Sequence, residues 1–65
     1  MIKNNLKKIR ENQGLTQRQI AEKLYIATSA YSNWERGECR PSIEMILELE
    51  KIFKCDFHDM FYEEE

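Results

Sequence analysis

The sequence contains only two cysteines, Cys39 and Cys55, and only two glycines among its 65 residues. Two cysteines do not form the disulfide framework that stabilises small secreted domains, so we expect reduced thiols and a cytoplasmic protein. No secretory signal and no long apolar run occur, and we therefore expect no membrane-spanning helix. The scarcity of glycine also leaves no glycine-rich loop of the kind that binds nucleotide phosphates.

Groups that could form a catalytic or metal site are equally scarce. No nucleophile stands near a base and no paired carboxylates stand out, which argues against an enzyme. Cys55, His58 and Asp59 raise the question of a metal site. A Cys-x-x-His pair supplies only two ligands, however, where zinc usually takes four, or three with an open position. We therefore predict no metal, no cofactor and no small-molecule ligand.

The length allows one domain over residues 1–65, with residues 62–65 as a short acidic tail. The net charge of −2 argues at first against binding nucleic acid. However, residues 1–41 carry eight basic and four acidic side chains, whereas residues 42–65 carry two basic and eight acidic ones. A dipolar molecule of this kind can still present a positive face to phosphates. An uneven but merely solvated surface explains the charges equally well.

The residues between positions 15 and 37 have the pattern of two short helices joined by a tight turn. The first, Gln17–Leu24, follows a capping-box pattern formed by Thr16 and Gln19. The second is predicted over Thr28–Arg36 and is followed by a glycine that can take the left-handed conformation of a helix stop. Two helices joined in this way form a helix-turn-helix.

Three further helices are predicted, over residues 5–13, over residues 43–54 after the cap Ser42, and from residue 57 after the cap Asp56. Residues 1–5 are expected to be a short lead-in, with Asn4 or Asn5 capping the first helix. Its apolar stripe is assigned to Ile2, Leu6 and Ile9. The apolar residues of the helix over residues 43–54 are Ile43, Ile46, Leu47, Leu49 and Phe53.

These features together resemble the Cro/repressor-type helix-turn-helix family, also called the XRE family. The matching residues, in order and at the family's spacing, are Arg10, Leu15-Thr16-Gln17, Ile20-Ala21, Ile26, Trp34-Glu35-Arg36-Gly37 and Arg40-Pro41-Ser42. The resemblance covers the chain from about Leu6 to Phe61. It implies an all-α, compact five-helix, lambda-repressor-like DNA-binding domain whose second and third helices form the helix-turn-helix.

Two positions in the turn depart from the family pattern. Tyr25 stands where glycine is usual, and a left-handed conformation there would cost about 1–2 kcal/mol. Ala27 stands where serine or threonine usually caps the third helix, and the lost cap costs about 1 kcal/mol. We consider Thr28 as the replacement cap, which would start the helix one residue later.

The resemblance places the base contacts at the family's base-reading positions, whereas the phosphate contacts are predicted from their places at the start of the second helix and the end of the third. The predicted base contacts are Thr28, Ser29, Ser32 and Asn33, and the predicted phosphate contacts are Gln17, Arg36 and Arg40. An asparagine can bond bidentately to adenine, whereas phosphate contacts position the protein without reading sequence. Gln17 could also brace the third helix. The alternative for all these residues is an ordinary solvated surface.

Two other sets of residues are predicted to be structural. The family implies a partly buried interhelical salt bridge between Arg10 and Glu35, with an exposed and weak pair as the alternative. Tyr31 and Trp34, at helical spacing, are expected to be core residues rather than a stacking platform.

The function implied by the resemblance is sequence-specific binding of double-stranded DNA by a transcriptional regulator. We interpret it as a repressor that binds a palindromic operator through the major groove as a homodimer, because a small monomer reads few base pairs. The dimer patch is assigned to Phe57, Phe61 and Tyr62, which exceed what so small a core needs. The alternative is an antitoxin or adaptor-type protein-interaction module in which acidic residues 42–65 bind a basic partner.

Overall fold

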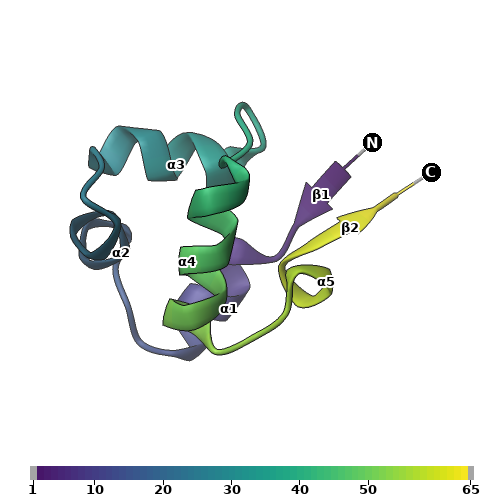
Figure 1. The fold of residues 1–65 in the computed structure, drawn as a ribbon, viewed down its shortest axis with the longest axis horizontal. Helices are drawn as coiled ribbons and strands as arrows, with labels where there is room; N and C mark the ends of the chain where they lie inside the picture. The colour runs from purple at the N-terminus through teal and green to yellow at the C-terminus, as the bar shows by residue number, and fades with distance from the viewer. Residues whose placement is uncertain (1, 65) are drawn as a thin grey trace.

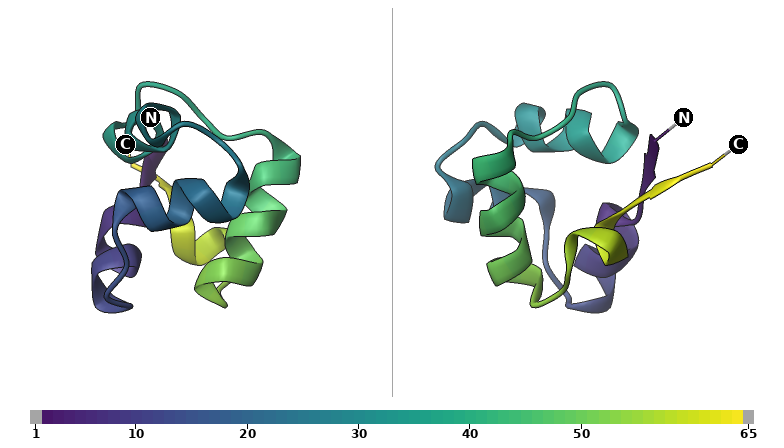
Figure 2. Two further views of the ribbon diagram at one scale, coloured as in Figure 1. Left: turned by 90° about the vertical axis from the view of Figure 1, so that its left-hand side faces the viewer. Right: turned by 45° about the vertical axis from the view of Figure 1, so that its right-hand side comes forward.

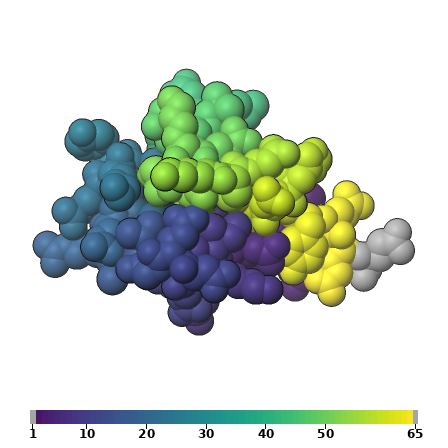
Figure 3. Space-filling model, turned by 90° about the horizontal axis from the view of Figure 1, so that it is seen from below, coloured from purple at the N-terminus to yellow at the C-terminus, as the bar shows by residue number. Residues whose placement is uncertain are grey.

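The computed structural model describes residues 2–64. Within them the chain forms β1 (Ile2–Asn4), α1 (Leu6–Asn12), α2 (Gln17–Leu24), α3 (Thr28–Arg36), α4 (Ile43–Phe53), α5 (Phe57–Met60) and β2 (Phe61–Glu63). The predicted helical fold is confirmed, and the bounds of α2 and α3 agree with the sequence pattern. In Figure 1, α3 runs across the top of the molecule and α4 descends in front of α1. The opposite surface is formed largely by α1, the end of α4 and α5 (Figure 3).

The two short strands correct the expectation of a lead-in and a tail. β1 and β2 form an antiparallel pair that joins the two ends of the chain, with Lys3 opposite Tyr62 and Asn4 opposite Phe61. The ends of both strands point away from the helices in Figure 1. A three-residue strand is too short to show the alternation that identifies strands in a sequence, and its partner lies at the other end of the chain. Residues 1 and 65 of the lead-in and tail lie outside the described residues.

The hydrophobic core takes side chains from every helix. Its buried residues are Leu6, Ile20, Ala21, Leu24, Tyr31, Trp34, Leu49, Phe53, Met60 and Phe61. Tyr31 and Trp34 are confirmed as core residues, with their rings edge to face and their centroids 5.9 Å apart. Aromatic pairs favour this geometry because the ring edge is positive and the ring face negative.

The predicted apolar face of α4 is wrong at two positions. Ile43 and Leu47 are 77% and 51% exposed, whereas Leu49 and Phe53 are buried. The side of α4 that faces the core carries Leu49 and Phe53, with Met45, Ile46 and Ile52 partly buried beside them. These residues share one side because side chains three or four positions apart lie together on a helix. Ile43 and Leu47 are four residues apart on the opposite side. The sequence-based assignment grouped apolar residues by type rather than by their angle around the helix.

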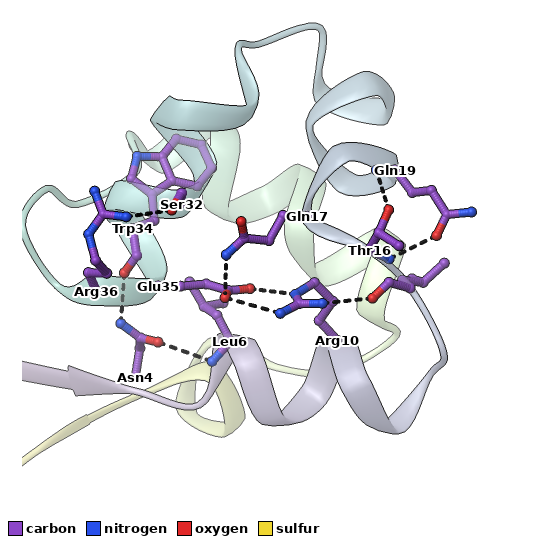
Figure 4. A network of polar contacts seen from close by, with 11 residues as sticks. Asn4, Leu6, Arg10, Thr16, Gln17, Gln19, Ser32, Trp34, Glu35 and Arg36 are labelled. Atoms are coloured by element: carbon purple, nitrogen blue, oxygen red, sulfur yellow. Dashed lines mark hydrogen bonds and ion pairs between the residues drawn. The ribbon is translucent and has the colours of Figure 1, made fainter.

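Asn4 connects three elements at the start of the chain. Its Oδ1 accepts a hydrogen bond from the backbone N of Leu6 at 3.1 Å, and its Nδ2 donates to the carbonyl oxygen of Trp34 at 2.9 Å. Asn4 therefore caps α1 and ties β1 to α3 (Figure 4). Asn5, the residue just before α1, makes no side-chain cap there; its Nδ2 donates to the carbonyl oxygen of Asp59 at 3.2 Å.

The turn between α2 and α3 keeps its shape despite its unusual residues. The capping box before α2 is present, with Gln19 N donating to Thr16 Oγ1 at 3.1 Å and Thr16 N donating to Gln19 Oε1 at 2.8 Å. Tyr25 ends α2 in the left-handed conformation, at φ 59°, with its side chain 95% exposed. Ala27 occupies the N-cap position of α3, and no side chain of the described residues accepts a hydrogen bond from the free N–H groups there. The alternative of a Thr28 cap is therefore wrong.

A buried ion pair fixes α3 against α1. Arg10 Nε donates to Glu35 Oε2 at 2.7 Å, and Arg10 Nη2 donates to Glu35 Oε1 at 3.3 Å. The two side chains are only 11% and 5% exposed. Arg10 Nη1 also donates to the carbonyl oxygen of Leu15 at 2.9 Å, and Gln17 Nε2 donates to Glu35 Oε1 at 2.9 Å. One carboxylate thus joins α1, α2 and α3, as Figure 4 shows.

The Tyr31 hydroxyl lies buried beside this pair. It forms no hydrogen bond of normal geometry among the described residues. Burial, together with the nearby Glu35 carboxylate, raises the pKa of Tyr31 far above its ordinary value. The ring therefore stays neutral and leaves Arg10 as the charged partner of Glu35.

Replacing Tyr25 with glycine should stabilise the protein. Glycine adopts the left-handed conformation without the steric cost of about 1–2 kcal/mol that a Cβ carries, although its extra freedom in the unfolded chain offsets part of the gain. We expect a net gain of about 0.5–1 kcal/mol, measured by urea and thermal unfolding. Tyr25→Ala is the control, because it removes the exposed ring but keeps the Cβ. Equal stability of the two variants would show that the turn is not strained.

Removing the Glu35 carboxylate should bring the protein close to unfolding. Glu35→Ala leaves Arg10 buried without its partner, which typically costs about 3–5 kcal/mol. A chain of this size has only about 3–10 kcal/mol in total. The control is Glu22→Ala, which breaks the exposed Arg18–Glu22 pair and should cost under about 1 kcal/mol. Similar melting temperatures for both variants would contradict the importance of the buried pair.

The same pair should make stability depend on pH. Burial alone would raise the pKa of the Glu35 carboxyl, but the hydrogen bonds from Arg10 and Gln17 outweigh it and hold the pKa below its ordinary value of 4.5. A carboxyl of lowered pKa contributes its stability above the ordinary value and loses it as the pH falls through the folded-state value. Below about pH 4.5, the unfolding free energy of the wild type should fall more steeply than that of Glu35→Gln.

Candidate nucleic-acid interface

The exposed face of α3 is polar along its whole length. Tyr31 and Trp34 point into the core and Glu35 points toward α1. The opposite side of the helix carries Ser29, Ser32, Asn33 and Arg36, and Thr28 lies at its N-terminal end. Thr28, Ser29 and Arg36 are exposed, whereas Ser32 and Asn33 are half-buried. The structure thus brings the predicted base-contacting residues together on one face, and α3 lies at the edge of the molecule in all three ribbon views (Figures 1 and 2).

Arg36 lies on this face and is held by its neighbours. Its Nη1 donates to Ser32 Oγ at 2.6 Å, and its Nη2 donates to Asn33 Oδ1. Nε and Nη2 also donate to Glu38 Oε2, at 3.3 and 3.0 Å. Three residues predicted to contact DNA are therefore joined through one guanidinium group. The Ser32 and Arg36 side chains lie on the side of α3 away from Glu35 (Figure 4).

Gln17, predicted as a phosphate contact, is not freely exposed. It is half-buried, and its amide nitrogen donates to Glu35 on α3. This is the bracing role considered for it in the sequence. In this structure one of its two amide donors is engaged within the protein.

Arg40 is exposed in the loop between α3 and α4. Among residues 2–64 it makes no hydrogen bond or ion pair, so its guanidinium is available to an anion. It also borders a small apolar cavity of about 200 Å³, lined in addition by Ile2, Pro41, Ile46, Phe57 and Phe61.

The aromatic residues assigned to a dimer patch differ in exposure. Phe61 is 8% exposed and belongs to the core, whereas Phe57 and Tyr62 are 40% and 43% exposed. Phe57 stacks on Phe61, with ring centroids 5.2 Å apart. Ile2, which is 40% exposed, lines the small apolar cavity together with Phe57 and Phe61. Tyr62 pairs with Lys3 and therefore lies on the other face of the strand pair. Of the exposed apolar residues at this end of the molecule, Ile2 and Phe57 therefore lie together, and we call this pair the apolar end surface.

Two tertiary roles and one residue escaped the sequence analysis. The cap at Asn4 was predicted but its bond to α3 was not, and Ile2 was wrongly assigned to the apolar stripe of the first helix, whereas it lies in β1. Asn4 and Ile2 act through the strand pair, which left no local signal. Glu38 had a usable signal, because the left-handed conformation expected at Gly37 turns the chain back over the end of α3. Within residues 2–64, no three histidine, cysteine or acidic side chains gather as a metal site would require. In the same range, no helix combines the length and apolar character needed to cross a membrane.

Comparison with known proteins agrees with this arrangement. The helix-turn-helix family model matches residues 6–60. The transcriptional activator BcrR of Enterococcus faecalis is 35% identical over 60 residues, which are 92% of this chain but 29% of the activator. The uncharacterized HTH-type transcriptional regulator YqaE of Bacillus subtilis is 36% identical over 52 residues, or 80% of this chain and 45% of the regulator. The chain thus spans less than half the length of these two relatives.

Other similarities extend over nearly the full length of both chains. The uncharacterized HTH-type transcriptional regulator MJ0272 of Methanocaldococcus jannaschii is 31% identical over 64 residues, which cover 98% of this chain and 97% of the regulator. A crystal structure of a candidate DNA-binding protein from Bacteroides fragilis superposes with a TM-score of 0.87 at 21% identity, covering 95% of this chain and all of the other. The match of the family model over most of the sequence and the shared lambda-repressor-like fold place this chain in the XRE-type helix-turn-helix family.

Proposed function

We propose that this protein is a transcriptional regulator that binds double-stranded DNA by inserting α3 into the major groove. The observation that carries the proposal is the continuous polar face of α3, held in a fixed orientation by the buried Arg10–Glu35 pair. A major groove admits an α-helix and presents a distinct pattern of donors and acceptors for each base pair. The names of the related regulators support the same conclusion.

The proposed contacts are of two kinds: base contacts that read the DNA sequence and phosphate contacts that position the protein on the duplex. Thr28, Ser29 and Asn33 lie on the exposed side of α3, where short polar side chains meet base edges. Asn33 offers an amide that can bond bidentately to adenine. Arg40 lies beyond the C-terminal end of α3 with no partner among the described residues, which suits a phosphate contact.

The proposed regulator is a homodimer on a palindromic operator, and it represses transcription by excluding polymerase from the promoter. Two copies related by a two-fold axis would read half-sites about one helical turn apart. The apolar end surface supports this assembly, because Ile2 and Phe57 are each 40% exposed and line the same cavity.

A second function is favoured by one observation on α4. Ile43 and Leu47 are exposed there next to Glu44 and Glu48. An acidic helix face with apolar anchors suits an antitoxin or adaptor that binds a basic partner. A mobility-shift experiment with genomic fragments at low and moderate salt distinguishes the two functions. Failure to prefer any fragment would favour the protein-interaction module.

Asn33→Ala should reduce specificity for the selected duplex, whereas Arg40→Ala should leave specificity unchanged. Asn33→Ala should weaken binding to a duplex selected from random DNA by about 1–3 kcal/mol, with little effect on a scrambled duplex or on the salt dependence. Arg40→Ala should weaken binding to both duplexes and reduce the salt slope by about one. Binding isotherms at several salt concentrations give both quantities. If Asn33→Ala weakened both duplexes equally, the proposed docking of α3 would be wrong.

The apolar end surface should hold the two copies together. Sedimentation equilibrium at micromolar concentration should give about twice the chain mass of 7.9 kDa. Phe57→Ser should shift the equilibrium toward monomer, because it removes exposed apolar area from the surface. Tyr25→Ser is the matched control, since that tyrosine is exposed in the helix-turn-helix. A monomer over the whole range, with and without DNA, would refute the dimer.

A further inference from the structure

The backbone at the end of α3 brings an acidic side chain onto the proposed DNA-binding face. Gly37 has φ 78°, its N–H donates to the carbonyl oxygen of Trp34 at 3.1 Å, and Glu38 N donates to that of Asn33 at 3.0 Å. These two bonds form the motif in which a left-handed residue reverses the chain after a helix. Glu38 is therefore held next to the last turn of α3 by the backbone as well as by its side chain.

The Glu38 carboxylate occupies the edge of Arg36 that a phosphate would use. Nε and Nη2 of Arg36 both donate to Glu38 Oε2, at 3.3 and 3.0 Å. A guanidinium offers five donors in a planar fork, and this fork pairs with carboxylates and phosphates alike. The bonds to Ser32 and Asn33 use two more of the donors. As arranged here, Arg36 has at most one N–H left for DNA, whereas no residue within 2–64 engages the five N–H donors of Arg40.

We propose that Glu38 is an internal competitor for DNA phosphate at Arg36, and that it sets the DNA affinity of this protein. On binding, a backbone phosphate replaces the Glu38 carboxylate on the Nε–Nη2 edge of Arg36. The guanidinium then moves away from Asn33, whose Oδ1 becomes free to accept from adenine. The phosphate contact and the base contact are thereby coupled through one side chain. This inference rests on the proposed DNA binding.

The direct test is removal of the Glu38 charge. Glu38→Gln should bind a duplex selected from random DNA, and a scrambled duplex of equal length, about two- to fivefold more tightly than the wild type, the range expected for breaking an exposed ion pair. The matched control is Glu44→Gln, which removes an exposed carboxylate that has no partner among the described residues. A gain no larger than that of Glu44→Gln would overturn the proposal.

The role of Arg36 is tested by a double-mutant cycle on the same duplexes. In an Arg36→Ala background, Glu38→Gln should increase DNA affinity no more than Glu44→Gln does. The reason is that the Arg36 guanidinium, for which Glu38 and phosphate compete, is then absent. An undiminished gain in that background would mean that Glu38 acts by general repulsion of DNA, and the proposal would fail.

A measurement without DNA separates this inference from the proposed function. In the free protein, the Arg36 Nε–H should exchange with water more slowly than the Arg40 Nε–H, as followed by ¹H–¹⁵N NMR. Glu38→Gln should speed the exchange at Arg36 alone. Equal exchange rates at the two arginines in the wild type would show that the Glu38 contact is absent, which overturns the inference whether or not the protein binds DNA. A slow Arg36 signal in a protein that binds neither duplex would instead refute the proposed function.

Discussion

The orientation of α3 depends on a single carboxylate. Glu35 receives hydrogen bonds from Arg10 on α1 and from Gln17 on α2, and it is almost entirely removed from water. A buried charge is tolerated only when its partner and its remaining hydrogen bonds are in place. The core aromatics Tyr31 and Trp34 fix the depth of α3 in the molecule. The ion pair fixes its rotation, and therefore which of its side chains face outward.

The local features of this fold could be predicted from the sequence because they depend on neighbouring residues. The capping box of Thr16 and Gln19 and the helix stop at Gly37 follow from side-chain and backbone chemistry within a few positions. The left-handed conformation at Tyr25 followed from the family resemblance, and tertiary packing maintains it although the residue type disfavours it. Ile43 and Leu47 were misplaced because the apolar residues of α4 extend around more than one side of the helix.

The non-local features could not be predicted in this way. Asn4 joins β1 to the carbonyl of Trp34, thirty residues away, through a strand too short to have a pattern. The candidate site shows the same division. The polar face of α3 is apparent from helical spacing, but the contacts among Ser32, Asn33, Arg36 and Glu38 depend on rotamers that only the structure supplies. Sequence spacing therefore predicts the members of this surface better than the bonds between them.

The pairing of β1 with β2 has a consequence for how the chain folds. Its helices make mostly local contacts, which favours rapid formation. The strand pair instead requires Lys3 to meet Tyr62, so nearly the whole chain must be ordered as one closed loop. The entropy lost on closing such a loop is large. The hydrogen bonds between two three-residue strands offset only a small part of this free-energy cost. We therefore expect the sheet to form after the helices have docked and to open first, which would make amide exchange fastest at the two ends of the chain.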